Sequence, residues 1–113
     1  MQKTQNVIID AETIIVNLMR EDNKEYLPIP RLRRLVNYIY KRLEEFSNNT
    51  RVIFDVSFDA IKRAVLYNNN LFELVGDTIY LKIELSKIEN IKDKIDNNLE
   101  KLIRNFSKEY AYA

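Results

Sequence analysis

The chain has 113 residues, of which 46% are hydrophobic and 31% charged, and its formal net charge is only +1. This balance is typical of one globular domain, which we expect over residues 1–113, with a core over 7–84 and a long helix over 85–110. The lack of cysteine and histidine excludes disulfides, thiolate chemistry, and the commonest general base and zinc ligand.

No apolar run approaches the roughly 20 residues of a membrane-spanning helix. The first ten residues, MQKTQNVIID, lack the charged and apolar segments of a signal peptide. We therefore expect a cytoplasmic protein with no membrane partner.

The first third of the chain predicts one helix followed by a loop. Residues 7–9 form either a short strand or an irregular lead-in. Asp10 is a suitable N-cap for a helix that runs to about Arg20. Residues 21–30 predict an acidic loop. Pro28 and Pro30 end this loop, and Pro30 suits the first turn of the next helix.

The next helix is predicted over about residues 30–46. Apolar side chains recur there at helical spacing and form one stripe: Leu32, Leu35, Val36, Ile39, Leu43 and Phe46.

The stretch 51–83 predicts a strand, a short helix and a hairpin. Apolar and polar residues alternate over 51–57, and Ser57 is a suitable N-cap for a helix in which Phe58, Ile61 and Val65 face the core. The strands 71–75 and 78–83 flank Gly76, the only glycine, which we expect to supply the positive φ of a tight turn. The predicted core is Leu35, Ile39, Leu43, Phe54, Ile61, Val65, Leu74, Ile79 and Leu81.

The short helix and the hairpin LFELVGDTIYLK over 71–82 resemble a winged-helix domain, and the resemblance covers roughly residues 30–83. It implies an α+β domain with a three-stranded antiparallel sheet and a helix that enters the DNA major groove. In this interpretation one helix separates the strand over 51–57 from the hairpin, whereas winged-helix domains usually have two.

Basic residues concentrate in the middle of the chain, since residues 31–63 carry eight basic and four acidic side chains. Arg31, Arg33 and Arg34 open a helix, where the helix dipole disfavours cations but suits bound anions. The alternative is that Glu21, Asp22 and Glu25 pair with them. A second basic group follows on the solvent face of the short helix. We predict a nucleic-acid-binding surface made of Arg31, Arg33, Arg34, Lys62, Arg63 and Tyr67; the alternative for the last three is an ordinary solvated face.

Carboxylates are the remaining candidates for catalysis. Asp10 with Glu12, and Asp55 with Asp59, flank two helix starts, and paired acids can bind Mg²⁺ or share proton transfer. Caps and first-turn acids produce the same pattern, so we expect no enzymatic activity, metal or cofactor.

The last helix is predicted over 85–110 and would be about 40 Å long. Its apolar stripe, at about 3.67 residues per turn, stays nearly straight. We predict a homodimer or partner interface formed by Ile91, Ile95, Leu99, Leu102, Phe106 and Tyr110; alternatively, the helix folds back over the sheet and the 30–46 helix. Two functions remain: a small nucleic-acid-binding protein, either a regulator or an accessory factor of a mobile element, or a dimerisation module without nucleic-acid binding.

Overall fold

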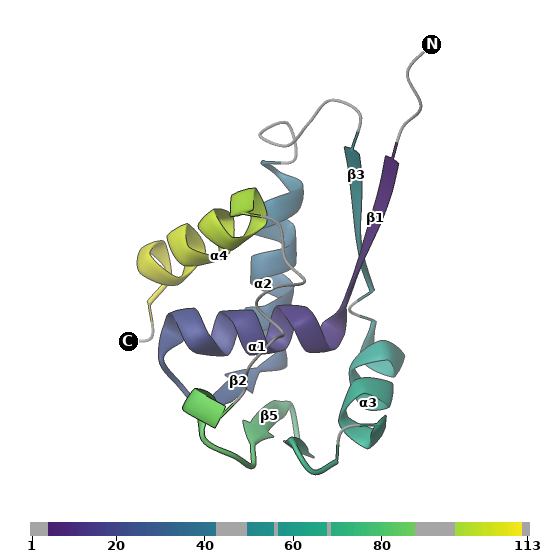
Figure 1. The fold of residues 1–113 in the computed structure, drawn as a ribbon, viewed down its shortest axis with the longest axis vertical. Helices are drawn as coiled ribbons and strands as arrows, with labels where there is room; N and C mark the ends of the chain where they lie inside the picture. The colour runs from purple at the N-terminus through teal and green to yellow at the C-terminus, as the bar shows by residue number, and fades with distance from the viewer. Residues whose placement is uncertain (1–4, 43–49, 56, 68, 88–96, 112–113) are drawn as a thin grey trace.

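The computed structural model describes residues 5–42, 50–55, 57–67, 69–87 and 97–111 of the chain (Figure 1). They form an α+β fold, as predicted from the sequence. Its elements are β1 (Gln5–Asp10), α1 (Ala11–Asp22), β2 (Tyr26–Pro28), α2 (Ile29–Tyr40), β3 (Thr50–Asp55), α3 (Phe58–Tyr67), β4 (Phe72–Val75), β5 (Thr78–Leu81), a 3₁₀ turn (Leu85–Lys87) and α4 (Asn97–Glu109). Among the described helices, none has the length and apolar character needed to cross a membrane.

Helix α1 is the central element, and the other elements surround it (Figure 1). It begins where Asp10 Oδ1 accepts a hydrogen bond from the Thr13 backbone N–H at 2.9 Å, which confirms the predicted cap. It ends at Asn23, in the left-handed conformation with φ 55°. Every residue from Thr13 to Met19 is buried. The polar Asn17 side chain is satisfied because its Nδ2 donates to the Thr13 carbonyl oxygen at 2.7 Å.

The antiparallel sheet has the strand order β2-β5-β4. The predicted three-stranded antiparallel sheet is therefore confirmed, but its third strand is β2, in the segment predicted as a loop. Ile79 in the central strand pairs with Leu27 on one side and Leu74 on the other. Gly76 has φ +64° in the turn between β4 and β5, as predicted.

Strand β3 does not join that sheet. It pairs in parallel with β1, from Gln5 opposite Thr50 to Asp10 opposite Asp55. Since β1 leads into α1 and β3 leads toward α3, this pairing brings the starts of the two helices together. Ser57 caps α3 as predicted, because its Oγ accepts from the Ala60 backbone N–H at 3.1 Å.

Helix α4 packs against α1 and α2. The predicted continuous helix over 85–110 is wrong at its start, where Leu85–Lys87 forms a 3₁₀ turn; residues 88–96, and so Ile91 and Ile95, lie outside the described residues. The thirteen residues of α4 span about 20 Å. A helix of that length is short enough for α1 and α2 to cover its apolar face.

The predicted dimer interface is therefore corrected. Leu99, Leu102 and Phe106 are at most 3% exposed within a single chain, and of the four described residues in the predicted interface only Tyr110, at 46%, remains open. The helix folds back within the monomer, as in the alternative, although α1 and α2 cover it instead of the sheet. The core thus extends beyond residues 7–84 to include α4.

Most of the predicted core is confirmed. Leu35, Ile39, Ile61, Ile79 and Leu81 are buried, while Val65 and Leu74 are partly buried against the same cluster. Leu43 and the Phe54 side chain lie outside what is described. The helix predicted over 30–46 is wrong at its end, because α2 stops at Tyr40 and residues 41–42 form a turn. Phe58 was predicted to face the core, but it is 44% exposed; the Lys62 ammonium lies 4.7 Å from the centre of its ring.

Candidate nucleic-acid interface

Arg31 belongs to the packing of three helices and is not available to nucleic acid. Its Nε and Nη2 donate to the two carboxylate oxygens of Asp22 at 2.8 and 2.6 Å, and Nη1 donates to the Tyr110 carbonyl oxygen. The guanidinium also lies 5.1 Å from the centre of the Phe106 ring. The prediction of an anion-binding Arg31 is therefore wrong, and the alternative of a pair with Asp22 is confirmed.

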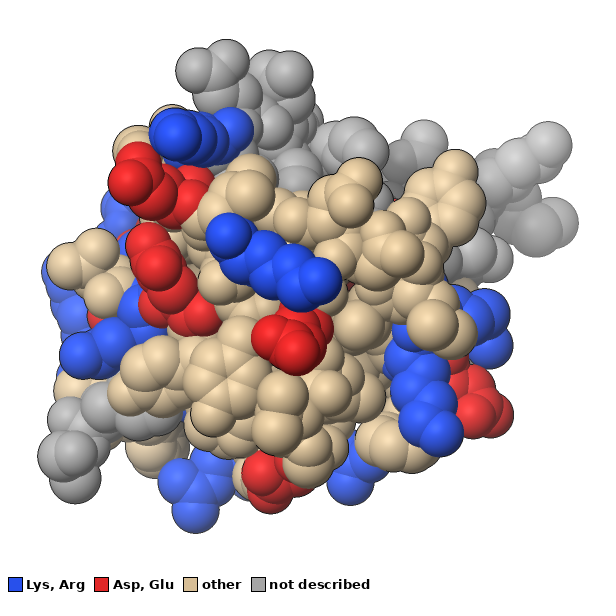
Figure 2. All heavy atoms as spheres, turned by 90° about the horizontal axis from the view of Figure 1, so that it is seen from below, with Lys and Arg blue, Asp and Glu red and all other residues tan. Residues whose placement is uncertain are grey.

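The other predicted cations lie in two separate places. Arg33 and Arg34 are exposed on α2, and Arg34 lines a hollow beside the end of α4. Arg63 lines a pocket between α1 and α3. Arg34 and Arg63 thus line different hollows. Figure 2 shows Lys and Arg on the hairpin side of the molecule interspersed with Asp and Glu.

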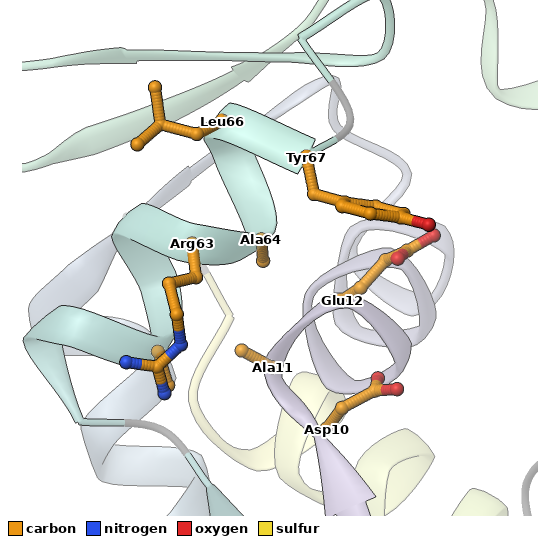
Figure 3. A pocket seen from close by; sticks show the side chains of 8 residues that line it. Asp10, Ala11, Glu12, Arg63, Ala64, Leu66 and Tyr67 are labelled. Carbon is orange, nitrogen blue, oxygen red and sulfur yellow. The ribbon is translucent and has the colours of Figure 1, made fainter.

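The pocket between α1 and α3 has a volume of about 640 Å³. Small side chains line its centre, which allows the two helices to approach closely. Figure 3 shows Ala11 and Ala64 in the middle, Arg63 at one end, and Tyr67 near Glu12 at the other. The pocket is lined by Asp10, Ala11, Glu12, Ala60, Arg63, Ala64, Leu66 and Tyr67.

The outer face of α3 is unusually exposed for a helix with apolar residues. Leu66 is 75% exposed and Tyr67 is 88% exposed, and Lys62 and Arg63 are exposed beside them. Lys62, Arg63 and Tyr67 are exposed, as helical spacing predicts, but Leu66 was not among the predicted site residues. Leu66 lies outside the helical stripe of Ile61 and Val65, and this position could have predicted its exposure. This face combines two cations, a phenol and an aliphatic side chain.

The predicted acid pairs, Asp10 with Glu12 and Asp55 with Asp59, are described only in part. Asp10 is used as the cap of α1, Asp59 is exposed on α3, and the Asp55 side chain is outside what is described. Among the described residues there is no cluster of three potential metal ligands.

The hairpin lies next to α3, since α3 contacts β4. Its exposed side chains include Val75, Asp77, Tyr80 and Lys82. Asp77 gives the turn a carboxylate, which accepts a hydrogen bond from the Thr78 hydroxyl at 3.3 Å.

Comparisons with protein families, with curated proteins and with solved structures find no match for this chain.

Proposed function

We propose that this chain is a non-enzymatic DNA-binding protein that contacts duplex DNA through α3 and the β4–β5 hairpin. The observation that carries the proposal is the exposed face of α3, directly before an antiparallel hairpin. The order of elements supports it. Strand β2, the third strand of the sheet, is followed by α2, by strand β3, by α3 and then by the hairpin, so two helices lie between β2 and the hairpin. Two helices is the usual number in winged-helix domains, where the helix before the wing often enters the major groove.

The chemistry of α3 suits such contacts. Its ten residues span about 15 Å, and the major groove of about 12 Å admits a helix. Lys62 and Arg63 supply charge for phosphates, and arginine can also donate two bonds to a guanine edge. Leu66 can contact a thymine methyl group and Tyr67 a phosphate oxygen.

The charge of this surface predicts weak, salt-sensitive binding. The net charge is +1, and two cations on α3 correspond to a slope of about −2 in a plot of log affinity against log salt. Binding is therefore best measured at about 50 mM salt, where the electrostatic contribution is large.

The experiment is fluorescence anisotropy of labelled duplexes with the wild type and with Lys62→Glu/Arg63→Glu. We expect the double variant to lose binding with little change in melting temperature, because contacts of exposed charged side chains contribute little to stability. Lys24→Glu/Lys87→Glu is the matched control, because it changes the net charge equally at exposed positions outside α3. Absence of wild-type binding at low salt would overturn the proposal, as would an equal loss in the control.

A second candidate is a protein-binding module that uses the same helix, favoured by the exposed Leu66 and Tyr67. Apolar patches of this kind mark protein interfaces. It differs from the dimer predicted from the sequence, which used the last helix. Self-association through α3 would appear by light scattering at about 100 µM. It would persist in high salt and disappear in Leu66→Ser, whereas DNA binding would weaken as salt rises.

A further inference from the structure

A basic groove lies between α2 and α4. Its volume is about 340 Å³, which is within the range of small-molecule sites. One wall comes from α2 and the turn that follows it, and the other from α4. The side chains with chemistry to offer are Arg34, Asn37, Lys41, Arg42, Phe106 and Tyr110.

Among the described residues that line this groove, every charged side chain is positive. Three of its lining residues are cations and none is acidic. Arg34 and Lys41 are seven residues apart, about 10 Å along the helix direction. In the described part of the chain neither of these two side chains forms a salt bridge. An anion is therefore the complementary ligand.

Aromatic rings form the rest of the groove and hold one cation in place. The Arg42 guanidinium lies 3.6 Å from the centre of the Tyr38 ring, and its Nη1 donates to the Tyr38 carbonyl oxygen at 3.2 Å. Tyr38 packs edge-on against Phe106 at 5.4 Å and Tyr110 at 6.0 Å between ring centres. The Tyr110 ring also packs against Phe106, at 5.2 Å between ring centres, and the residue is 46% exposed, so part of it is open to a ligand.

We propose that this groove binds a nucleoside phosphate, with the phosphate near Lys41 and the base against Tyr110. A cationic groove with an accessible aromatic ring is the combination that recognises a phosphate and a base together. Glu109 supports this orientation, because it lies with Arg34 and Tyr110 in the adjoining hollow. A carboxylate there disfavours a phosphate at that end. Asn37 is then placed between the two ends to hydrogen-bond the ligand.

The proposal does not depend on DNA binding by α3, which lies on the other side of α1 (Figure 1). Two sources can supply the ligand: a free mononucleotide, or one nucleotide of a single strand. Both present the same phosphate and base, and the titrations below distinguish them.

The test is isothermal titration calorimetry of the full chain at about 50 mM salt. The probes are adenosine 5′-monophosphate, adenosine, inorganic phosphate and a single-stranded deoxyadenosine hexamer. We expect the monophosphate to bind about tenfold or more tighter than adenosine or phosphate alone. Tighter binding of the hexamer than of the monophosphate would identify a single strand as the source, and the reverse order a free nucleotide.

The variants locate the site. Lys41→Gln should weaken monophosphate binding by about tenfold, and Tyr110→Leu should weaken both the monophosphate and adenosine. Lys108→Gln, on the exposed part of α4 but outside the groove lining, is the matched control and should bind as the wild type. Lys62→Glu/Arg63→Glu should also retain binding, which separates this site from α3.

Three results would overturn the proposal. The first is no heat with the monophosphate or the hexamer at concentrations up to about 5 mM. The second is inorganic phosphate binding as tightly as the monophosphate, which would exclude a role for the rings. The third is an equal loss in Lys108→Gln and Lys41→Gln, which would indicate general charge attraction.

Discussion

Replacing Asp22 by alanine should destabilise the fold more than any other single change of a charged residue described above. The Asp22 side chain is 1% exposed and accepts hydrogen bonds from two other helices. Arg31 on α2 donates two bonds at 2.8 and 2.6 Å, and the Ser107 hydroxyl on α4 donates one at 2.6 Å. This carboxylate therefore joins the end of α1 to both neighbouring helices.

The magnitude follows from what alanine would leave behind. The Arg31 side chain is only 10% exposed, so a mostly buried guanidinium would lose the Asp22 carboxylate. Removing one partner of a buried pair typically costs about 3–5 kcal/mol. Ser107→Ala removes a single hydrogen bond to a charged group and should cost about 1.5–3 kcal/mol. Asp22→Leu with Arg31→Met removes both charges and should cost less than Asp22→Ala.

Urea unfolding followed by circular dichroism measures these free energies. Glu25→Ala is the matched control, because Glu25 is exposed in the same segment, and it should change the stability by about 0.5 kcal/mol or less. A loss below about 1 kcal/mol for Asp22→Ala would refute the reasoning, because the carboxylate would then be solvated. So would an Asp22→Leu/Arg31→Met variant whose cost equals the summed costs of Asp22→Leu and Arg31→Met measured separately.

Three other predictions concern the stability of the fold. Ile39 is fully buried, so Ile39→Ala should cost about 2–5 kcal/mol in urea unfolding. Gly76→Val should cost more than about 1 kcal/mol and Gly76→Asn less than Gly76→Val. No atom lies within 4 Å of a Cβ built at Gly76, so the penalty comes from the positive φ alone. Leu102→Asp/Phe106→Asp should unfold the chain, as seen by circular dichroism, because both side chains lie in the core; a folded variant would contradict the packing of α4.

Local features were predictable because they depend on residues close together in the chain. The caps Asp10 and Ser57 bond backbone groups three residues away, and Gly76 needs only its own backbone conformation. The pairing of β2 with β5 depends instead on residues about fifty positions apart. Its three residues end in proline, so no periodic pattern marks the strand.

The apolar stripe of the last helix was identified, but not the surface that covers it. Leu99, Leu102 and Phe106 are equally suited to a second copy and to the same chain. Their true partner includes α1, whose polar Thr13 and Asn17 are buried, so an amphipathic pattern underestimates how much of that helix is covered.

The candidate sites were only partly predictable for a related reason. Lys62, Arg63 and Tyr67 are exposed as expected from helical spacing. Arg31 is not, because its counter-charge comes from the preceding helix. The groove of Lys41 and Tyr110 was missed, since it exists only where two distant helices meet.

The parallel pairing of β1 with β3 also bears on the order in which the protein folds. Gln5 meets Thr50, whereas Val75 meets Thr78 in the hairpin. Closing a loop of about 45 residues instead of about 3 costs roughly 2 kcal/mol more in chain entropy. We therefore expect the hairpin amides to gain protection before those of β1 and β3 in pulse-labelled hydrogen exchange; simultaneous protection would contradict this order. Because β1 and β3 bring the starts of α1 and α3 together, the pocket between these helices would be completed late in folding.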